Sequence, residues 1–278
     1  MLTQSDKART FRALHERKGA FIIPNPSDVG TARLLAHLGF EALATTSAGY
    51  AFTAGKPDHG VTRNNMLEHV ASIAAGVDLP VSGDLENGFG DSPQDAAQTI
   101  LMAASSGLVG ASIEDSTNRS GDPIYEIGLA ADRIRAAAEA AHSLPFPFIL
   151  TARAENYLHG RNDLADTIKR LQAYQDAGAN VLYAPGLTRK EDIETVVRSV
   201  DRPVNVLAGL GDAPLDLATL SALGVKRISV GGALSRAALG AFLRAAHEMR
   251  DNGTFTFAKD AASGRELNII FARFEDRR

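Results

Sequence analysis

The sequence of 278 residues contains no cysteine and no tryptophan. Without cysteine the chain can form no disulfide, can bind no metal through thiolates and has no cysteine nucleophile. An excess of basic residues is also absent, because 29 Lys and Arg residues stand against 33 Asp and Glu residues, giving a net charge of −4. We therefore expect no nucleic acid among its partners.

Long hydrophobic runs are missing as well. The first residues, MLTQSDKARTFRALHERKG, are polar and charged, and no stretch reaches the roughly 18 uninterrupted apolar residues that a bilayer span requires. We expect no membrane partner and a cytoplasmic location. The composition, 45% hydrophobic and 22% charged, is typical of a globular protein. The length favours one large domain over two.

Eight short apolar runs alternate with segments of helical spacing. The runs are Phe21–Asn25, Ala42–Ser47, Pro80–Glu86, Val109–Asp115, Phe148–Glu155, Val181–Gly186, Val204–Gly209 and Arg227–Gly232. Several of the helical segments end in a glycine that suits a helix C-cap, such as Gly39, Gly107 and Gly178. This succession indicates βαβ units and a parallel sheet. Eight such units predict an α/β fold, the TIM (β/α)8 barrel, with an open doubly wound sheet as the alternative.

Two segments lie outside this alternation. Residues Ser5–Lys18 predict an extra N-terminal helix that could cover the bottom of the barrel. Residues 251–278 predict a C-terminal helical arm, and its apolar stretch LNIIFARF needs a partner surface. No linker or low-complexity segment divides the chain, so residues 1–278 are expected to form a single α/β-barrel domain.

Charged residues gather at the C-terminal ends of the expected strands, where barrel enzymes place their active sites. The third strand ends at Asp84 and Glu86, and their spacing of two predicts that both side chains lie on one face. Glu114 ends the fourth strand and Arg153 lies at the end of the fifth. Three converging carboxylates need a cation to offset their repulsion, and hard oxygen ligands suit Mg²⁺. The alternative is that these carboxylates are solvated surface charges.

Other residues near the strand ends allow two interpretations each. Arg153 could contact a ligand, or it could simply pair with Glu155 or another barrel carboxylate. Asn205, in the seventh strand, could face the barrel mouth or serve as a hydrogen-bonded core amide. Of the seven histidines, only His59, beside Asp58, is expected near the site.

Four motifs follow one another between Ser47 and Asn156: SAGY…GKPDHG, GDLENGFG, GASIED and LTARAEN. The second resembles the D-x-D/E-x-G-[FY]-G signature of the isocitrate lyase/phosphoenolpyruvate mutase superfamily. The others resemble, in the family's order, its S-G-x…x-PD-x-G segment, its strand ending in E-D and its A-R-T-D-A strand. The barrel pattern extends the resemblance to roughly Phe21–Arg250.

The resemblance implies a barrel enzyme that binds Mg²⁺, or Mn²⁺ in its place, and a small 2-oxo acid or its enolate. Asp84, Glu86 and Glu114 match the metal-site carboxylates, most of which act through metal-bound water. Asp58 matches an acid beside the substrate, and Arg153 matches the arginine that neutralises charge on the reacting oxygen or carboxylate.

The resemblance also implies that the segment beginning at Ser47 holds the substrate carboxylate through backbone N–H groups and a hydroxyl. The candidates for substrate contact are Ser47, Ala48, Gly49, Tyr50, Asp84, Arg153 and Asn205. Family members often form oligomers in which a C-terminal helix swaps between neighbours, so a homo-oligomer, a dimer or a tetramer, is expected.

The loop after the fourth strand departs from the family. The lyases carry K-[KR]-C-G-H there, whereas this chain reads STNRSGDPIYE, with Ser120 at the cysteine position. The mutase-type loop is matched only by Asn118. The hydroxyl of a serine has a pKa far above that of a thiol, so cleavage of isocitrate or methylisocitrate is not expected. The catalytic candidates are Arg153, Asp58, Ser120 and Asn118. The loop Ser116–Glu126 is expected to be a mobile lid.

The sequence therefore predicts a Mg²⁺-dependent carbon–carbon lyase of carboxy-lyase type. Its substrate would be a small 2-oxo acid that reacts through an enolate, with oxaloacetate the first to test. Decarboxylation needs little beyond enolate stabilisation, because CO₂ leaves without taking a proton. Two alternatives stay open: a phosphonopyruvate-type hydrolase or phosphonomutase, and a non-catalytic 2-oxo acid binder.

Overall fold

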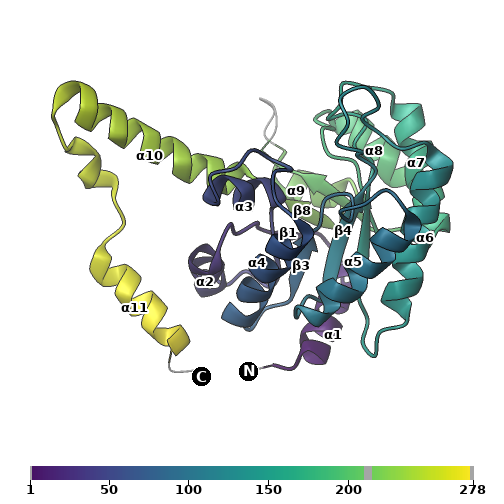
Figure 1. Ribbon diagram of the computed structural model, residues 1–278, viewed down its shortest axis with the longest axis horizontal. Coiled ribbons are helices and arrows are strands. Elements are labelled where there is room, and N and C mark those ends of the chain that lie inside the picture. The colour runs from purple at the N-terminus through teal and green to yellow at the C-terminus, as the bar shows by residue number, and fades with distance from the viewer. Residues whose placement is uncertain (1, 210–214, 276–278) are drawn as a thin grey trace.

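The computed structural model describes residues 2–209 and 215–275. The described residues form eight parallel strands: β1 (Phe21–Ile23), β2 (Leu43–Ala44), β3 (Val81–Asp84), β4 (Gly110–Glu114), β5 (Ile149–Arg153), β6 (Val181–Tyr183), β7 (Val204–Leu207) and β8 (Arg227–Ser229). The strands pair in the order β1-β8-β7-β6-β5-β4-β3-β2. A hydrogen bond of 3.1 Å from the Ala44 N–H to the Pro24 carbonyl bridges β2 and the end of β1. The predicted TIM barrel is confirmed (Figure 1).

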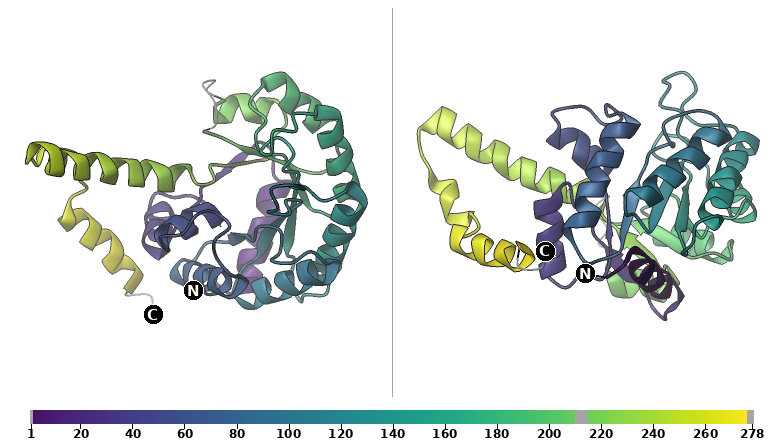
Figure 2. Two further views of the ribbon diagram at one scale, coloured as in Figure 1. Left: turned by 45° about the horizontal axis from the view of Figure 1, so that its top comes forward. Right: turned by 60° about the horizontal axis from the view of Figure 1, so that its bottom comes forward.

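Helices surround the strands on the outside of the barrel (Figure 2). They are α2 (Val29–His37), α3 (Ser47–Thr53), α4 (Arg63–Gly76), α5 (Pro93–Ser105), α6 (Ile127–His142), α7 (Leu164–Asp176), α8 (Lys190–Arg198) and α9 (Leu217–Ala222). Local sequence explains their ends. Ser92 caps α5 in a capping box with Asp95, and Gly107, with φ of +90°, adopts the left-handed conformation after that helix ends. The chain can then enter β4 within a few residues.

An extra N-terminal helix, α1 (Gln4–Glu16), lies at the N-terminal end of the strands, as predicted. Phe11 is fully buried and packs in one cluster with Phe21 of β1 and Ile149 of β5. The Lys7 ammonium donates a hydrogen bond of 2.7 Å to the Val77 carbonyl. This helix closes the bottom of the barrel, so ligands have to approach from the opposite end.

The C-terminal part of the chain leaves the barrel. Helix α10 (Ala233–Asn252) extends away from it, and the 3₁₀ helix η1 (Thr256–Asp260) and α11 (Gly264–Glu275) turn back toward α2 (Figures 1 and 2). An ion pair of 3.0 Å between Arg33 of α2 and Glu275 joins α11 to the barrel. The projecting segment therefore starts upstream of residue 251. Among the described helices, none is long and apolar enough to cross a membrane.

All eight strands are shorter than the predicted runs, and two of the differences affect the site. β2 ends at Ala44 because Thr46 caps α3, accepting a hydrogen bond of 3.2 Å from the Gly49 N–H, so that Ser47 is already helical. β3 ends at Asp84, and Glu86 has a left-handed backbone with φ of +50°. The prediction that Asp84 and Glu86 lie on one face of one strand is therefore wrong, although both residues remain at the same end of the barrel.

Candidate active site

Asp84, the last residue of β3, is held from two sides. Its Oδ2 accepts hydrogen bonds from the backbone N–H and the hydroxyl of Ser47, at 2.9 and 2.8 Å. Its Oδ1 accepts hydrogen bonds from Arg153 Nη1 at 2.9 Å and from Ser112 Oγ at 3.3 Å. The first turn of α3, the ends of β3 and β5 and the middle of β4 thus meet at one carboxylate.

Arg153, at the end of β5, joins further carboxylates to Asp84. Its Nη1 lies 3.3 Å from Glu114 Oε2, and its Nη2 lies 2.7 Å from Glu155 Oε1. Burial acts to lower the pKa of Arg153, but the charges of Glu155, Glu114 and Asp84 outweigh it and raise that pKa well above its ordinary value. The guanidinium therefore stays charged and offsets the repulsion among the acids.

Glu86 and Glu114 each keep one carboxylate oxygen free. Oε1 of each is buried and has no hydrogen-bond partner among the described residues. Burial raises the pKa of Glu86, and it raises the pKa of Glu114 well above the ordinary value. Buried carboxylate oxygens of this kind are normally satisfied by ordered water or by a bound cation.

His59, in the loop before α4, contacts the other carboxylate oxygen of Glu86, Oε2. Its Nδ1 lies 3.3 Å from Glu86 Oε2. This hydrogen bond raises the pKa of His59 to about 9, against the effect of burial and with help from the charges of Glu114 and Asp58. Asp58 Oδ2 lies 4.0 Å from His59 Nε2.

Asp84, Glu86 and Glu114 suit a Mg²⁺ site in which only some of the contacts to the ion are direct. In residues 2–209 and 215–275, no three His, Asp or Glu side chains are arranged to hold a metal ion directly. Arg153 Nη1 contacts both Asp84 and Glu114, which keeps these acids from forming a ready cage. Mg²⁺ usually takes one or two carboxylates and retains several waters. The free oxygens of Glu86 and Glu114 fit contact through metal-bound water. Asp84 could bind the ion directly only by exchanging one of its contacts with Ser47, Ser112 or Arg153 for the metal.

The segment expected to hold the substrate carboxylate lies beside Asp84, but two of its donors are engaged. The Ser47 N–H donates to Asp84 and the Gly49 N–H to Thr46. Gly49 is also sterically required, since a Cβ there would lie 2.5 Å from the Thr46 side chain. Ala48 is half-buried next to them. Tyr50 lies apart, with its ring stacked on His69 at 3.9 Å between centroids.

Asn205 lies inside the barrel and not at its mouth. Its Oδ1 accepts a hydrogen bond of 2.9 Å from Arg227 Nε, and its Nδ2 donates one of 3.0 Å to Ser229 Oγ. Both amide atoms are thus engaged by residues of the neighbouring strand β8. This geometry favours the core-amide interpretation.

The loop Ser116–Glu126 is hydrogen-bonded at its base and exposed at its tip. The Thr117 N–H donates to the Pro123 carbonyl at 2.8 Å, and Asn118 Oδ1 accepts from Ser116 Oγ at 3.1 Å. Ser120 is exposed and makes no hydrogen bond to another described residue. Asn118 lines the cleft at the barrel mouth, whereas Ser120 is not among the residues that line it. Closure of the loop over a substrate stays a prediction.

A cleft and a smaller cavity adjoin the acids. The cleft, of about 480 Å³, opens at the mouth and is lined by His59, Val61, Thr62, Arg63, Asn64, Glu86, Asn87, Phe89, Gly90 and Asn118. The cavity, of about 50 Å³, lies among the strand ends and is lined by Asp84, Ser112 and Arg153 together with residues from the other strands. Substrate would enter through the cleft.

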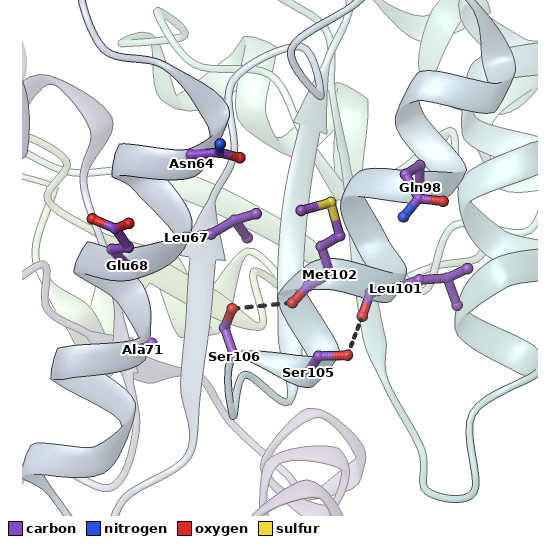
Figure 3. Close-up of a pocket in the computed structure, with 9 residues that line it drawn as sticks. All are labelled: Asn64, Leu67, Glu68, Ala71, Gln98, Leu101, Met102, Ser105 and Ser106. Carbon is purple, nitrogen blue, oxygen red and sulfur yellow. Dashed lines mark hydrogen bonds between the residues drawn. The ribbon is translucent and has the colours of Figure 1, made fainter.

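Figure 3 shows a different groove, of about 510 Å³, on the outer surface between α4 and α5. The hydroxyls of Ser105 and Ser106 bond the carbonyls of their own helix, those of Leu101 and Met102. Glu68 is the one ionisable side chain among the residues drawn. The groove lacks the convergent titratable groups of the strand ends, so we do not assign the reaction to it.

Sequence reasoning does not single out Ser112, Tyr183 or Arg227. Ser112 binds Asp84, and the ring centroid of Tyr183 lies 5.1 Å from the Arg153 guanidinium carbon. Alternation offers a signal for Ser112, which lies two residues before Glu114 on the same strand. Arg227 has its own signal, a charge at the start of an apolar run.

Comparison with known proteins agrees with this geometry. A family model described as phosphoenolpyruvate phosphomutase matches residues 11–250. The chain belongs to this family. A solved structure from Burkholderia cenocepacia, provisionally described as a lyase/mutase, is 63% identical, with a TM-score of 0.95 and coverage of 97% of each chain. The resemblance to the isocitrate lyase/phosphoenolpyruvate mutase superfamily is confirmed.

Two curated relatives are equally similar in sequence. The oxaloacetate decarboxylase of Pseudomonas fluorescens is 27% identical over 282 residues, covering 99% of this chain and 94% of that protein. The 2-methylisocitrate lyase of Bacillus subtilis is 27% identical over 215 residues, covering 75% and 68%. Identity alone therefore does not select between the two reactions, and the residues of the site have to do so.

The contact between His59 and Glu86 has a measurable consequence. We expect NMR titration to give His59 a pKa near 9, and Glu86→Gln to lower it toward the ordinary value of about 6.5. Because the folded-state pKa is raised, the contact stabilises the fold fully below about pH 6.5, and the effect is lost as the pH rises through about 9. The exposed Glu126→Gln serves as the control. An unchanged His59 pKa in Glu86→Gln would contradict the assigned contact.

Proposed function

We propose that the protein is a Mg²⁺-dependent carbon–carbon lyase of carboxy-lyase type that acts on a small 2-oxo acid, with oxaloacetate the first candidate. The observation that carries the proposal is the group formed by Arg153 and the acids Asp84, Glu86 and Glu114 at the strand ends. One guanidinium and two unpartnered carboxylate oxygens meet there beside an open cleft. Such a site suits stabilisation of a developing oxyanion.

Different residues would hold the metal ion, orient the substrate and stabilise negative charge on its keto oxygen. Asp84 directly, with Glu86 and Glu114 through water, would hold Mg²⁺ (or Mn²⁺), which supplies a Lewis acid that polarises the keto oxygen of the substrate. Ala48, whose N–H is not engaged by Asp84 or Thr46, would orient the substrate carboxylate, whereas Ser47 uses its N–H and its hydroxyl to hold Asp84. Arg153 keeps its charge and stabilises negative charge on the keto oxygen.

The reaction then needs no acid in the lid. The bond between C3 and the departing carboxylate breaks, its electron pair forms the enolate, and CO₂ leaves. A proton from water in the cleft at the mouth converts the enolate to pyruvate. The lyase reaction of the methylisocitrate type needs an additional proton transfer, and the exposed hydroxyl of Ser120 is poorly suited to supply it. This difference supports the decarboxylase over the lyase.

The proposal predicts a selective activity. We expect pyruvate release from oxaloacetate with Mg²⁺ and its loss with EDTA. Glyoxylate release from isocitrate and pyruvate release from methylisocitrate should be slower by on the order of 10²–10⁴, the usual contribution of a positioned acid–base group. Coupled assays for pyruvate and glyoxylate measure all three. Efficient cleavage of either isocitrate would contradict the proposal. Phosphate release from phosphonopyruvate without turnover of oxaloacetate would favour the hydrolase, and binding without any turnover would favour the binder.

Asp84 provides a direct test of the metal assignment. We expect Asp84→Ala to weaken the Mg²⁺-dependent binding of oxalate, a planar analogue of the enolate, by at least about 10- to 100-fold, since even outer-sphere changes have effects of that size. Titration calorimetry measures both affinities, with circular dichroism to confirm folding. The exposed Asp132→Ala on α6 is the matched control. Equal affinity for Mg²⁺ and oxalate in Asp84→Ala would show that the metal binds elsewhere.

The projecting arm supports the proposal of a homo-oligomer. On α10 the side chains of Phe242 and Leu243 are 70% and 56% exposed, and Ser235 is its one buried residue. Large apolar residues on a projecting helix favour packing against a second copy, in which swapping of this segment between neighbours is the expected arrangement.

Light scattering tests the oligomer. We expect a dimer or tetramer for the wild type and a shift toward the monomer for Phe242→Asp, because a charge in an apolar interface is desolvated without a partner. Leu129→Asp, which changes a residue of α6 that is 40% exposed, serves as the control and should not alter the mass. A monomeric wild type at micromolar concentration would contradict the proposal.

A further inference from the structure

A buried arginine supports the turn that carries Glu86. Arg133, on α6, is 1% exposed. Its Nη1 donates hydrogen bonds to the carbonyls of Gly90 and Ser92, at 2.7 and 3.3 Å, and its Nη2 donates one to the carbonyl of Asn87. The hydrogen bonds that it makes to described residues thus all go to the backbone of one turn. Arginine is rarely buried to this degree unless its charge is used, so this placement requires a reason.

The backbone of this turn needs support from outside. Glu86 and Phe89 have φ values of +50° and +58°, a region that non-glycine residues seldom occupy. Conformations of this kind persist only where the surrounding structure holds them. Arg133 holds the carbonyl of the residue directly after Glu86, and Thr99 Oγ1 donates a hydrogen bond of 2.7 Å to the Gly88 carbonyl. Side chains of α5 and α6 therefore fix the turn.

The position of this turn determines where the free oxygen of Glu86 lies. The Glu86 carbonyl accepts a hydrogen bond of 3.0 Å from the Glu114 N–H, which ties the turn to β4. Glu86 Oε2 lies 3.3 Å from His59 Nδ1, whereas the buried Oε1 has no hydrogen-bond partner among the described residues. Groups that orient a metal-site residue from behind affect metal affinity nearly as much as the ligands do. A displaced turn would move this oxygen away from the other acids.

Tyr125 links Arg133 with the loop Ser116–Glu126. Its ring centroid lies 4.4 Å from the Arg133 guanidinium carbon, a distance typical of a cation–π contact. Its hydroxyl donates a hydrogen bond of 2.5 Å to Asp91 Oδ1, and Arg119 Nη1 donates one of 2.8 Å to Asp91 Oδ2. The turn and the loop are thus joined in one network around Arg133.

We propose that Arg133 is a positioning residue of the metal site, which holds the turn of residues 86–92 so that Glu86 contacts the ion through water. Arg133 acts through the backbone of the turn and touches neither metal nor substrate. The inference rests on the proposed function only in its metal ion, and it does not depend on which 2-oxo acid reacts. Loss of Arg133 is therefore expected to weaken metal binding itself.

Binding of Mn²⁺, followed by the electron paramagnetic resonance signal of the free ion, measures this role without turnover. We expect Arg133→Met to weaken Mn²⁺ binding by about 10-fold or more, the usual effect of removing a group that orients a metal-site residue. Arg133→Lys keeps the charge but not the fork of donors, so it should recover only part of the loss. The exposed Arg135→Met on the same helix is the matched control and should bind as the wild type does. Unchanged Mn²⁺ affinity in a folded Arg133→Met would overturn the proposal.

Hydrogen exchange of the metal-free protein separates this inference from the proposed reaction. The Gly88 N–H donates a hydrogen bond of 2.9 Å to the Leu85 carbonyl, and we expect it to lose much of its protection in Arg133→Met. The amides of β7 should keep their wild-type rates. If Arg133→Met does not fold, Arg133→Lys decides, and wild-type exchange at Gly88 with wild-type Mn²⁺ affinity would then overturn the proposal. Normal Mn²⁺ binding by the wild type without turnover of oxaloacetate would contradict the proposed reaction alone.

Discussion

The ion pairs of Arg153 are the interaction on which the candidate site depends. Asp84, Glu114 and Glu155 come from three successive strand ends, and their mutual repulsion would be severe in a largely buried setting. One planar guanidinium, which can bond several carboxylates at once, makes the cluster tolerable. The same cluster leaves one oxygen free on Glu86 and one on Glu114. The site is therefore stable as it stands and still able to accept a further positive charge.

The proposed function rests on the charges at the strand ends and on the exposure of Ser120 in the loop Ser116–Glu126. The positive charge of Arg153 lies among the acids at the strand ends, whereas in the loop Ser116–Glu126 the charge of Arg119 is paired with Asp91 and Asp122 and Ser120 is exposed. A site of this kind can stabilise charge on a substrate oxygen without assisting a demanding proton transfer from the lid. Since the relatives of both reaction types are equally similar in sequence, this contrast between barrel and lid carries the choice between them.

Much of the fold was predictable because its signals are local. Apolar runs alternate with segments of helical spacing, and several of these segments end in a glycine. Strand ends in a barrel all meet at one face, which brings Asp84, Glu114 and Arg153 together. The contacts that the sequence could not predict depend on loop conformations and on residues far apart in the chain. Glu86 turns into a left-handed backbone after β3, and it meets His59 from a loop 27 residues away. The pairing of Ser47 with Asp84 likewise depends on how α3 begins, which alternation along β2 does not reveal.

The most direct measurement is diffraction from crystals that contain Mg²⁺ and oxalate, the planar analogue of the enolate. The account predicts Mg²⁺ at about 2.1 Å from a carboxylate oxygen of Asp84, with ordered water between the ion and Glu86 or Glu114. It also predicts oxalate on that ion, within hydrogen-bond distance of Arg153 and of the segment that begins at Ser47. Metal and oxalate bound away from Asp84, or no bound oxalate at saturating concentration, would contradict the account.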